Sequence, residues 1–220
     1  MSEQERRCQE ETARPQFGAS EVDRVTARIG LLREDLERLK ARFPYMDRSS
    51  IGLCEVGTAP RYRARGHDVR FVFSRPLSAE DVATNNRITQ WLNECFVVRL
   101  HAVLESSGVV HSKRPLDESL PGHAEVRLVR KLRNAIGHGS AEYNERDPRD
   151  RGLWRELQRV CHLNDVELPA AGGKLPLPID RVIDPLVEGC ISYTRALAFR
   201  SGETQAEDRD AGRELDDADG

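Results

Sequence analysis

The apolar positions of residues 20–43 recur at alternating steps of three and four, the spacing of a heptad seam along one helix. Ser20 stands where a helix cap is expected, and Pro44 follows where the helix must end. The segment 20–50 is therefore predicted to form one long N-terminal helix with its flanking turn. Its seam leaves two interpretations open, packing in a bundle of this chain or pairing with a second chain. The seam positions are Val22, Val25, Ile29, Leu32, Leu36, Leu39 and Phe43.

Residues 51–77 follow a different pattern, with two short apolar runs in place of helical spacing. GLCEVG and VRFVFS resemble strands, and they flank the basic stretch RYRARGHD at 61–68. The segment is predicted to be a hairpin or an extended arm that carries Arg61, Arg63 and Arg65.

Residues 78–200 return to helical spacing in four segments. Ser78 and Asp81 form a predicted capping box for a long helix over 78–107, and further helices are expected from about Ala124, over 151–162, and around residues 186–197. VELPAAGGKLPLPI, at 166–179, has three prolines and a Gly-Gly pair and is predicted to be a small β-hairpin. The expected core positions of the first two helices are Val82, Ile88, Leu92, Cys95, Phe96, Val103, Val129, Leu132 and Ile136, and those of the last two are Leu153, Leu157, Val160, Leu186, Val187, Cys190, Ile191, Thr194 and Leu197.

The fold class predicted by these elements is all-α, a helical bundle with minor β-hairpin decoration. The hydrophobic fraction of 38% is modest and the charged fraction of 32% is high for 220 residues, which favours a thin core between amphipathic helices. Residues 1–19 and the acidic segment 201–220 are polar and aperiodic, and both are predicted to be disordered.

The charge is distributed unevenly along the chain. The last twenty residues hold eight acidic and two basic side chains, a net of −6, whereas the whole chain carries −3. The first two hundred residues therefore carry +3, a balance that permits a nucleic-acid partner without requiring one. The tail could also cover a basic cleft as a mimic of RNA.

The cysteines and the apolar runs bear on the compartment. The five cysteines are scattered, and none is spaced as Cys-x-x-Cys. No apolar run approaches the ~20 residues that span a bilayer, and the N-terminus has no hydrophobic stretch typical of a signal peptide. We expect a reduced, cytoplasmic protein with no membrane partner.

The stretch KLRNAIGHGSAEYN, residues 131–144, concentrates polar groups of different chemistry at a predicted helix end. Asn134 and His138 are four residues apart and share a helix face, whereas Arg133 points ~140° away from His138 on a regular helix. Gly137 and Gly139 bracket the histidine and allow the helix end to loosen. A helix C-terminus also favours the imidazolium form of His138.

The octapeptide LRNAIGHG, residues 132–139, resembles the signature of the HEPN superfamily. That signature is an arginine, four to six residues and a histidine, often with a polar residue after the arginine; Arg133, Asn134 and His138 match it. The resemblance covers roughly residues 78–199, a HEPN-like helical domain to which the N-terminal helix is an extension. It implies a HEPN-like helical bundle.

The resemblance further implies metal-independent RNA cleavage in a cleft between two such domains, with no cofactor. One imidazole would take the proton of the attacking 2′-hydroxyl and a second would protonate the leaving 5′-oxygen, so a homodimer is expected. Arg133 would hold the phosphate and Asn134 would orient His138 or the phosphate. The predicted RNA-binding residues are Arg61, Arg63, Arg65 and Lys131. The family also implies a toxin or phage-defence role.

The chain departs from one pattern of the family. HEPN toxins paired with a nucleotidyltransferase antitoxin tend to carry a tyrosine two residues after the histidine, and Ser140 holds that position here. This departure speaks against a nucleotidyltransferase antitoxin, and an antitoxin or regulatory partner of another kind stays open. Two other interpretations remain open: a non-catalytic HEPN module that binds a nucleotide or RNA, and a dimeric adaptor in which the polar helix end is only a cap.

Overall fold

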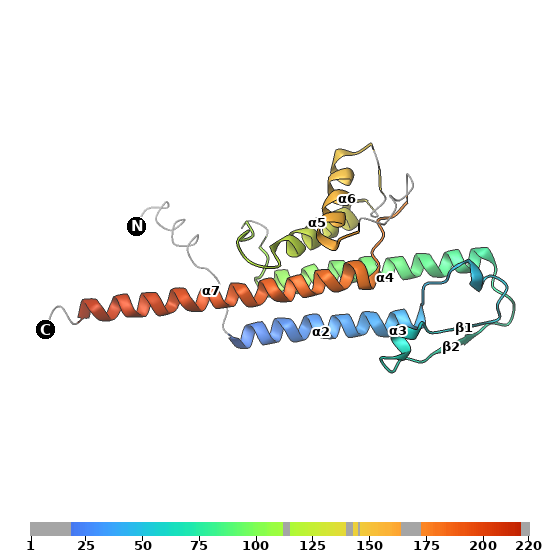
Figure 1. Cartoon of the computed structure of the whole chain (residues 1–220), viewed down its shortest axis with the longest axis horizontal. Coiled ribbons are helices and arrows are strands. Elements are labelled where there is room, and N and C mark those ends of the chain that lie inside the picture. Colours follow the sequence, from blue (N-terminus) through green and yellow to red (C-terminus); the bar gives the residue numbers. More distant parts are fainter. Residues whose placement is uncertain (1–18, 112–114, 140–142, 145, 164–172, 217–220) are drawn as a thin grey trace.

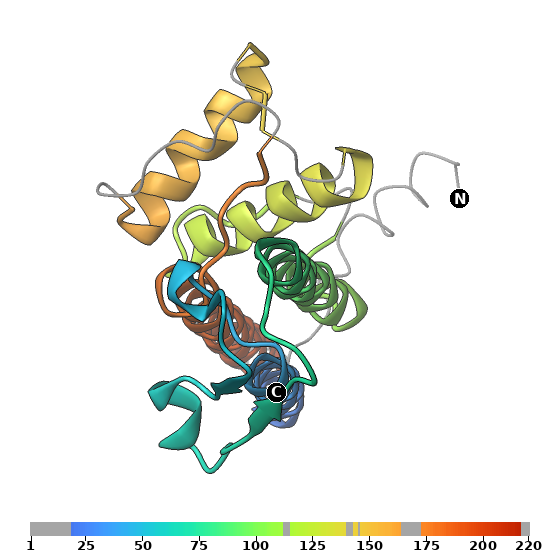
Figure 2. The ribbon, with the colours of Figure 1, turned by 90° about the vertical axis from the view of Figure 1, so that its right-hand side faces the viewer.

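Three long helices and two shorter ones make up most of the structure, a computed structural model that describes residues 19–111, 115–139, 143–144, 146–163 and 173–216 (Figure 1). The long helices are α2 (Ala19–Arg42), α4 (Ala79–Ser106) and α7 (Asp184–Asp216), and the shorter ones are α5 (His123–Gly139) and α6 (Pro148–Cys161). Helix α2 lies along both α4 and α7 on one side, and α5 contacts both on the other side (Figure 2). The predicted all-α class is confirmed, since the described residues are mostly helical with one small two-stranded sheet.

One hydrophobic core joins all five of these helices. Helix α2 buries Val25, Ile29 and Leu36 in the same cluster as residues of α4, α5, α6 and α7, so it is part of the bundle and not an appendage. The largest fully buried side chains include Ile29, Leu100, Leu128, Leu157, Ile183 and Leu186.

The heptad seam predicted along α2 is buried only in its first part. Val25 and Ile29 are fully buried and Leu36 is 4% exposed, but Leu39 is 39% and Phe43 36% exposed, so packing within the bundle does not account for the last two seam positions. A straight helix turns ~20° away from a strict heptad in every seven residues. The buried line accordingly moves to Glu37 and Lys40, where burial lowers the pKa of the lysine to about 8.

The segment 51–77 contains the predicted hairpin. Strand β1 (Glu55–Gly57) pairs antiparallel with β2 (Arg70–Val72), with Val56 opposite Phe71. The basic stretch between them is not an extended loop, because residues Pro60–Arg63 form the short helix α3. Proline at its first position has no N–H to lose and a backbone angle already suited to a helix. Figure 1 shows the hairpin and α3 together at one end of the bundle.

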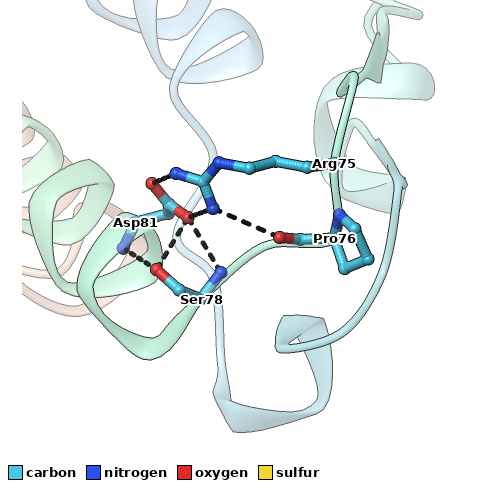
Figure 3. Close-up of polar contacts among 4 residues, drawn as sticks. All are labelled: Arg75, Pro76, Ser78 and Asp81. Atoms are coloured by element: carbon cyan, nitrogen blue, oxygen red, sulfur yellow. Dashed lines mark hydrogen bonds and ion pairs between the residues drawn. The ribbon is translucent and has the colours of Figure 1, made fainter.

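The capping box predicted at the start of α4 is present (Figure 3). The Ser78 Oγ accepts from the Asp81 N–H at 3.2 Å, and the Asp81 carboxylate accepts from the Ser78 N–H at 2.8 Å. Arg75 adds two hydrogen bonds to the same carboxylate, at 2.8 and 3.0 Å. These bonds, first from Arg75 and then from Ser78, lower the pKa of Asp81 to about 2.

Replacing Ser78 with alanine removes the cap and is expected to lower the free energy of unfolding by about 1 kcal/mol. The loss arises because the Asp81 N–H then has no partner in the first turn of α4. Chemical denaturation of the variant measures it. Ser74→Ala, at an exposed position before the helix, is the control and should leave the stability unchanged within about 0.5 kcal/mol.

Three further predictions differ from the structure or lie beyond it. Ile88, predicted in the core, is 37% exposed, because it points ~100° away from the buried Thr89, which donates to the Phe43 carbonyl beside the end of α2. The described part of the predicted second hairpin, 173–179, holds no strand and leads into a π-helical turn, Ile179–Ile183; its remainder lies outside the described residues. The predicted disorder of 1–19 falls, except at residue 19, outside them as well.

Helix α7 also differs from the expectation at its C-terminal end. The sequence predicts a disordered tail from residue 201, whereas α7 continues to Asp216. The tail's composition explains this: it has few apolar residues for packing, but Glu, Ala, Gln and Arg are good helix formers that extend an existing helix without a new nucleus.

Candidate functional site at the end of helix α5

Helix α5 turns one face to the core and presents the candidate residues on the other. Val126, Val129 and Leu132 are buried, whereas Arg133 is half-buried and Asn134 is exposed. An Arg133 Nη1 N–H donates to the Asn134 Oδ1 at 3.1 Å. The two neighbours therefore form one polar pair on the outer face of α5, and the guanidinium and the amide keep further N–H groups that can donate to a phosphate.

His138 lies in the last turn of α5, one turn beyond Asn134, as the sequence predicts. The structure describes its backbone but not its side chain, and residues 140–142, which include Ser140, lie outside the described part. The convergence of His138 with Arg133 and Asn134 stays a prediction from the helical spacing.

The four predicted RNA-binding residues do not gather around this site. Arg61 lies 2.6 Å from the Asp184 carboxylate and Arg65 pairs with Glu37, whereas Arg63 is exposed. Arg33 joins the same group, 3.1 Å from Asp184. Figures 1 and 2 place α3 beside α2 and α5 on the opposite side of the bundle. The basic stretch and the end of α5 are therefore separate surfaces of one chain.

Lys131, the fourth of these residues, forms an ion pair with Glu156 of α6. Glu156 is buried and also accepts from the Arg127 Nε at 2.7 Å. Burial acts to raise the pKa of Glu156, but the hydrogen bonds and charges of Lys131 and Arg127 outweigh it and lower the pKa. These ion pairs of Glu156 with Arg127 and Lys131 link α6 to α5, the helix that carries the Arg133–His138 motif.

Glu156→Gln is expected to lower the free energy of unfolding at pH 7 by about 1–2 kcal/mol, because two cations lose their partner but remain partly solvated. A carboxyl whose pKa is lowered by folding stabilises the fold above its unfolded pKa, and that contribution disappears as the pH falls through the folded pKa. The difference between wild type and variant should therefore shrink below about pH 4. Urea denaturation across pH 3–7 measures it, and a constant difference would contradict the assignment.

His101 of α4 is a candidate residue that the sequence did not indicate. It is 7% exposed, and its Nδ1 lies 3.7 Å from the Glu105 carboxylate. Burial lowers its pKa; Glu105 opposes this, and the charges of Arg133 and Arg130 add to the lowering. A neutral imidazole therefore lies near Arg133. Nothing in the sequence indicated a role for His101, because it occupies a core-facing position of α4, between Leu100 and Leu104.

A cavity of about 450 Å³ opens beside the end of α5, on the face of α4. Most of its lining comes from α4, and Ile136 contributes from α5, two residues before His138. A second cavity, of about 500 Å³, lies between the hairpin and the start of α4, away from the motif. The residues that line the first cavity are Trp91, Glu94, Cys95, Val98, Arg99, Ile136 and Lys174.

Comparisons with protein-family models, curated proteins and solved structures give no match for this chain. Within the described part of the chain, no three His, Cys, Asp or Glu side chains come together in a way that could hold a metal ion. Among the described helices, none is both long and apolar enough to cross a membrane.

Proposed function

We propose that this protein is a metal-independent endoribonuclease of the HEPN type, acting as a homodimer on RNA. The observation that carries the proposal is the exposed Arg133–Asn134 pair, hydrogen-bonded at 3.1 Å, one helical turn before His138 in LRNAIGHG. An exposed guanidinium and amide beside a histidine can bind a phosphodiester and transfer protons to and from it.

The proposed reaction needs no group beyond these side chains and the RNA. A neutral imidazole takes the proton of the ribose 2′-hydroxyl, whose oxygen attacks the adjacent phosphorus. The bond from phosphorus to the 5′-oxygen breaks, and an imidazolium gives that oxygen its proton. The products are a 2′,3′-cyclic phosphate and a 5′-hydroxyl. Arg133 stabilises the negative charge on the non-bridging oxygens.

Asn134 has a defined part in this proposal. Its Oδ1 accepts from Arg133, so its side chain offers the amide N–H groups to the substrate. The hydrogen bond to Oδ1 positions the Arg133 guanidinium. In the proposal, the Asn134 Nδ2 N–H groups then donate to the phosphate or to His138. The amide flip is fixed by the arginine, since a guanidinium cannot accept a hydrogen bond.

The second imidazole is the reason for a dimer. His101 lies near Arg133 within the same chain, but it is only 7% exposed and is poorly placed to reach a substrate. His138 from a second copy, related by a two-fold axis, is the better source. One copy would then act as base while the other acts as acid.

The HEPN-like bundle is part of the proposal, and the order of helices around the motif supports it. A long helix, α4, precedes the motif helix α5, and α6 and α7 follow. The toxin or phage-defence setting, with an antitoxin or regulatory partner, is likewise proposed. Growth arrest on expression, relieved by His138→Ala, tests that setting.

Digestion of single-stranded RNA by the purified protein in EDTA tests the reaction. We expect cleavage that EDTA does not inhibit, with a 2′,3′-cyclic phosphate on the upstream product. A product with a 3′-hydroxyl, or activity lost to EDTA and restored by a divalent cation, would contradict the mechanism.

A dimeric adaptor is the second candidate, and the exposed apolar side chains of α4 favour it, with Trp91 at 57% exposure. An adaptor would dimerise and leave RNA intact. The same digestion, combined with a measured molecular mass, separates the two candidates.

A further inference from the structure

Helix α4 carries an apolar stripe that the rest of the described chain leaves open. Its members are Ile88, Trp91, Cys95 and Val98, spaced by three, four and three residues, which places them on one face of the helix. Ile88 is 37%, Trp91 57% and Val98 36% exposed, and Cys95 is half-buried. We call this face the α4 stripe.

The α4 stripe has the composition of a contact surface. A large aromatic side chain beside aliphatic ones is typical of the centre of protein interfaces, where tryptophan contributes most per residue. Ile136 of α5 borders the same face and lines the cavity of about 450 Å³ with Trp91, Cys95 and Val98. The open surface thus reaches the turn of α5 that precedes His138.

Two opposite charges flank the α4 stripe on the same side. Arg87 and Glu105 are eighteen residues apart, which is five full turns of an α-helix at 3.6 residues per turn. Arg87 is exposed, with a hydrogen bond to Thr84 Oγ1 at 2.9 Å, and the Glu105 side chain is 52% exposed. The midpoint between them is residue 96, next to Cys95 in the C-terminal half of the stripe.

This arrangement is self-complementary. When two identical helices pair antiparallel about a two-fold axis, the same flank of each faces the other, and positions equidistant from the axis meet. With the axis near residue 96, each Arg87 faces the partner's Glu105, and the stripes overlap over residues 94–98, around Cys95. In a parallel two-fold pair the equivalent flanks lie on opposite sides of the seam, so Arg87 and the partner's Glu105 would not meet.

We propose that a second copy of this chain docks antiparallel on the α4 stripe, with the two-fold axis near Cys95 and reciprocal ion pairs between Arg87 and the partner's Glu105. Ile136 borders the stripe, so this interface would bring the two α5 ends to opposite sides of one axis. Only the role of the dimer in RNA cleavage rests on the proposed function. The geometry of the pairing stands on α4 alone.

Charge reversal tests the register. Arg87→Glu and Glu105→Arg each turn two attractive pairs into two repulsive ones, and each is expected to raise the dimer Kd on the order of tenfold. The double variant restores opposite charges and should recover the wild-type Kd. An equimolar mixture of the two single variants should form heterodimers in preference to either homodimer, since both ion pairs return there.

Sedimentation equilibrium measures these constants, and Arg155→Glu, an exposed reversal on α6, is the matched control that should leave the Kd unchanged. Trp91→Ala should raise the Kd by more than a hundredfold on the scale of interface hot spots, because each dimer loses two indoles. Single reversals without effect, or a double variant no better than either single one, would overturn the register.

The thiol at the axis gives an independent readout. In a chain with Cys8→Ser and Cys54→Ser, a short bis-maleimide should cross-link Cys95 to the partner's Cys95, and Cys95→Ser should abolish the product; Cys161 and Cys190 are buried. Absence of the cross-link in a protein that is dimeric overturns this interface, whether or not RNA is cut. A cross-linked dimer that never cuts RNA overturns the ribonuclease and leaves the interface standing.

Discussion

Replacing His138 with alanine is expected to lower the rate of RNA cleavage by a factor of about 10²–10⁴, the contribution of a positioned general acid or base. In the proposed dimer the substitution removes both imidazoles at once, so the upper part of this range applies. Folding should not change, because His138 occupies the last turn of α5, beyond its buried residues. Initial rates in EDTA and a thermal melt of each protein measure the two quantities.

Arg133→Ala is expected to reduce cleavage to a similar extent, since the phosphate loses its cation and Asn134 loses the group that orients it. Arg133→Lys keeps the charge but not the planar fork, and should recover only part of the rate. Arg155→Ala, on the exposed side of α6, is the matched control. If the rate falls equally with Arg155→Ala, or does not fall with His138→Ala, the end of α5 is not the catalytic site.

Gly122→Ala is expected to destabilise the fold by roughly 2–5 kcal/mol, from a backbone cost of about 1–2 kcal/mol and an overpacking cost of about 1–3 kcal/mol. Gly122 precedes α5 with φ at +79°, a left-handed conformation that disfavours a side chain. A Cβ there would lie 2.0 Å from the Gly189 carbonyl oxygen and 2.9 Å from the Tyr193 nitrogen, both in the backbone of α7. Neither can move without shifting α5 against α7.

Gly52→Ala separates the two costs. Gly52 also has a left-handed φ, +87°, but no atom lies within 4 Å of a Cβ placed there. It should therefore lose only the backbone part, about 1–2 kcal/mol. Urea denaturation of both variants gives the comparison, and equal losses would show that α5 and α7 do not approach as closely as the structure has them.

Helix caps and other features formed by neighbouring residues could be predicted from the sequence. The Ser78–Asp81 box starts α4 as predicted, because a cap involves only neighbouring residues. The α2 heptad was a weaker guide: it locates the helix, but which positions are buried depends on the straightness of the helix and on the extent of α4 and α7 beside it. Leu39 and Phe43 are exposed although Lys40 and Ala41 between them are buried, Lys40 against α4, so their direction on the helix, and not the extent of the neighbouring helices, exposes them.

The candidate site likewise has features that follow from neighbouring residues and features that depend on distant ones. The placement of Arg133 and Asn134 on one helix could be anticipated from the sequence, although their contact could not, since neighbouring residues point ~100° apart on a helix. The positions of Arg61 and Lys131 could not, because their carboxylate partners are 123 and 25 residues away. His101 could not be found either, since its proximity to Arg133 arises only from the packing of α4 on α5.

The ion pairs between α3 and the bundle limit what the basic stretch can offer a polyanion. Arg61 and Arg65 are already held by Asp184 and Glu37. Free arginines release small counterions when they bind a phosphate backbone, and that release makes the affinity fall steeply as salt is added. These two would instead exchange one carboxylate for another anion, so the arm should add little to such a salt dependence, however basic its sequence is.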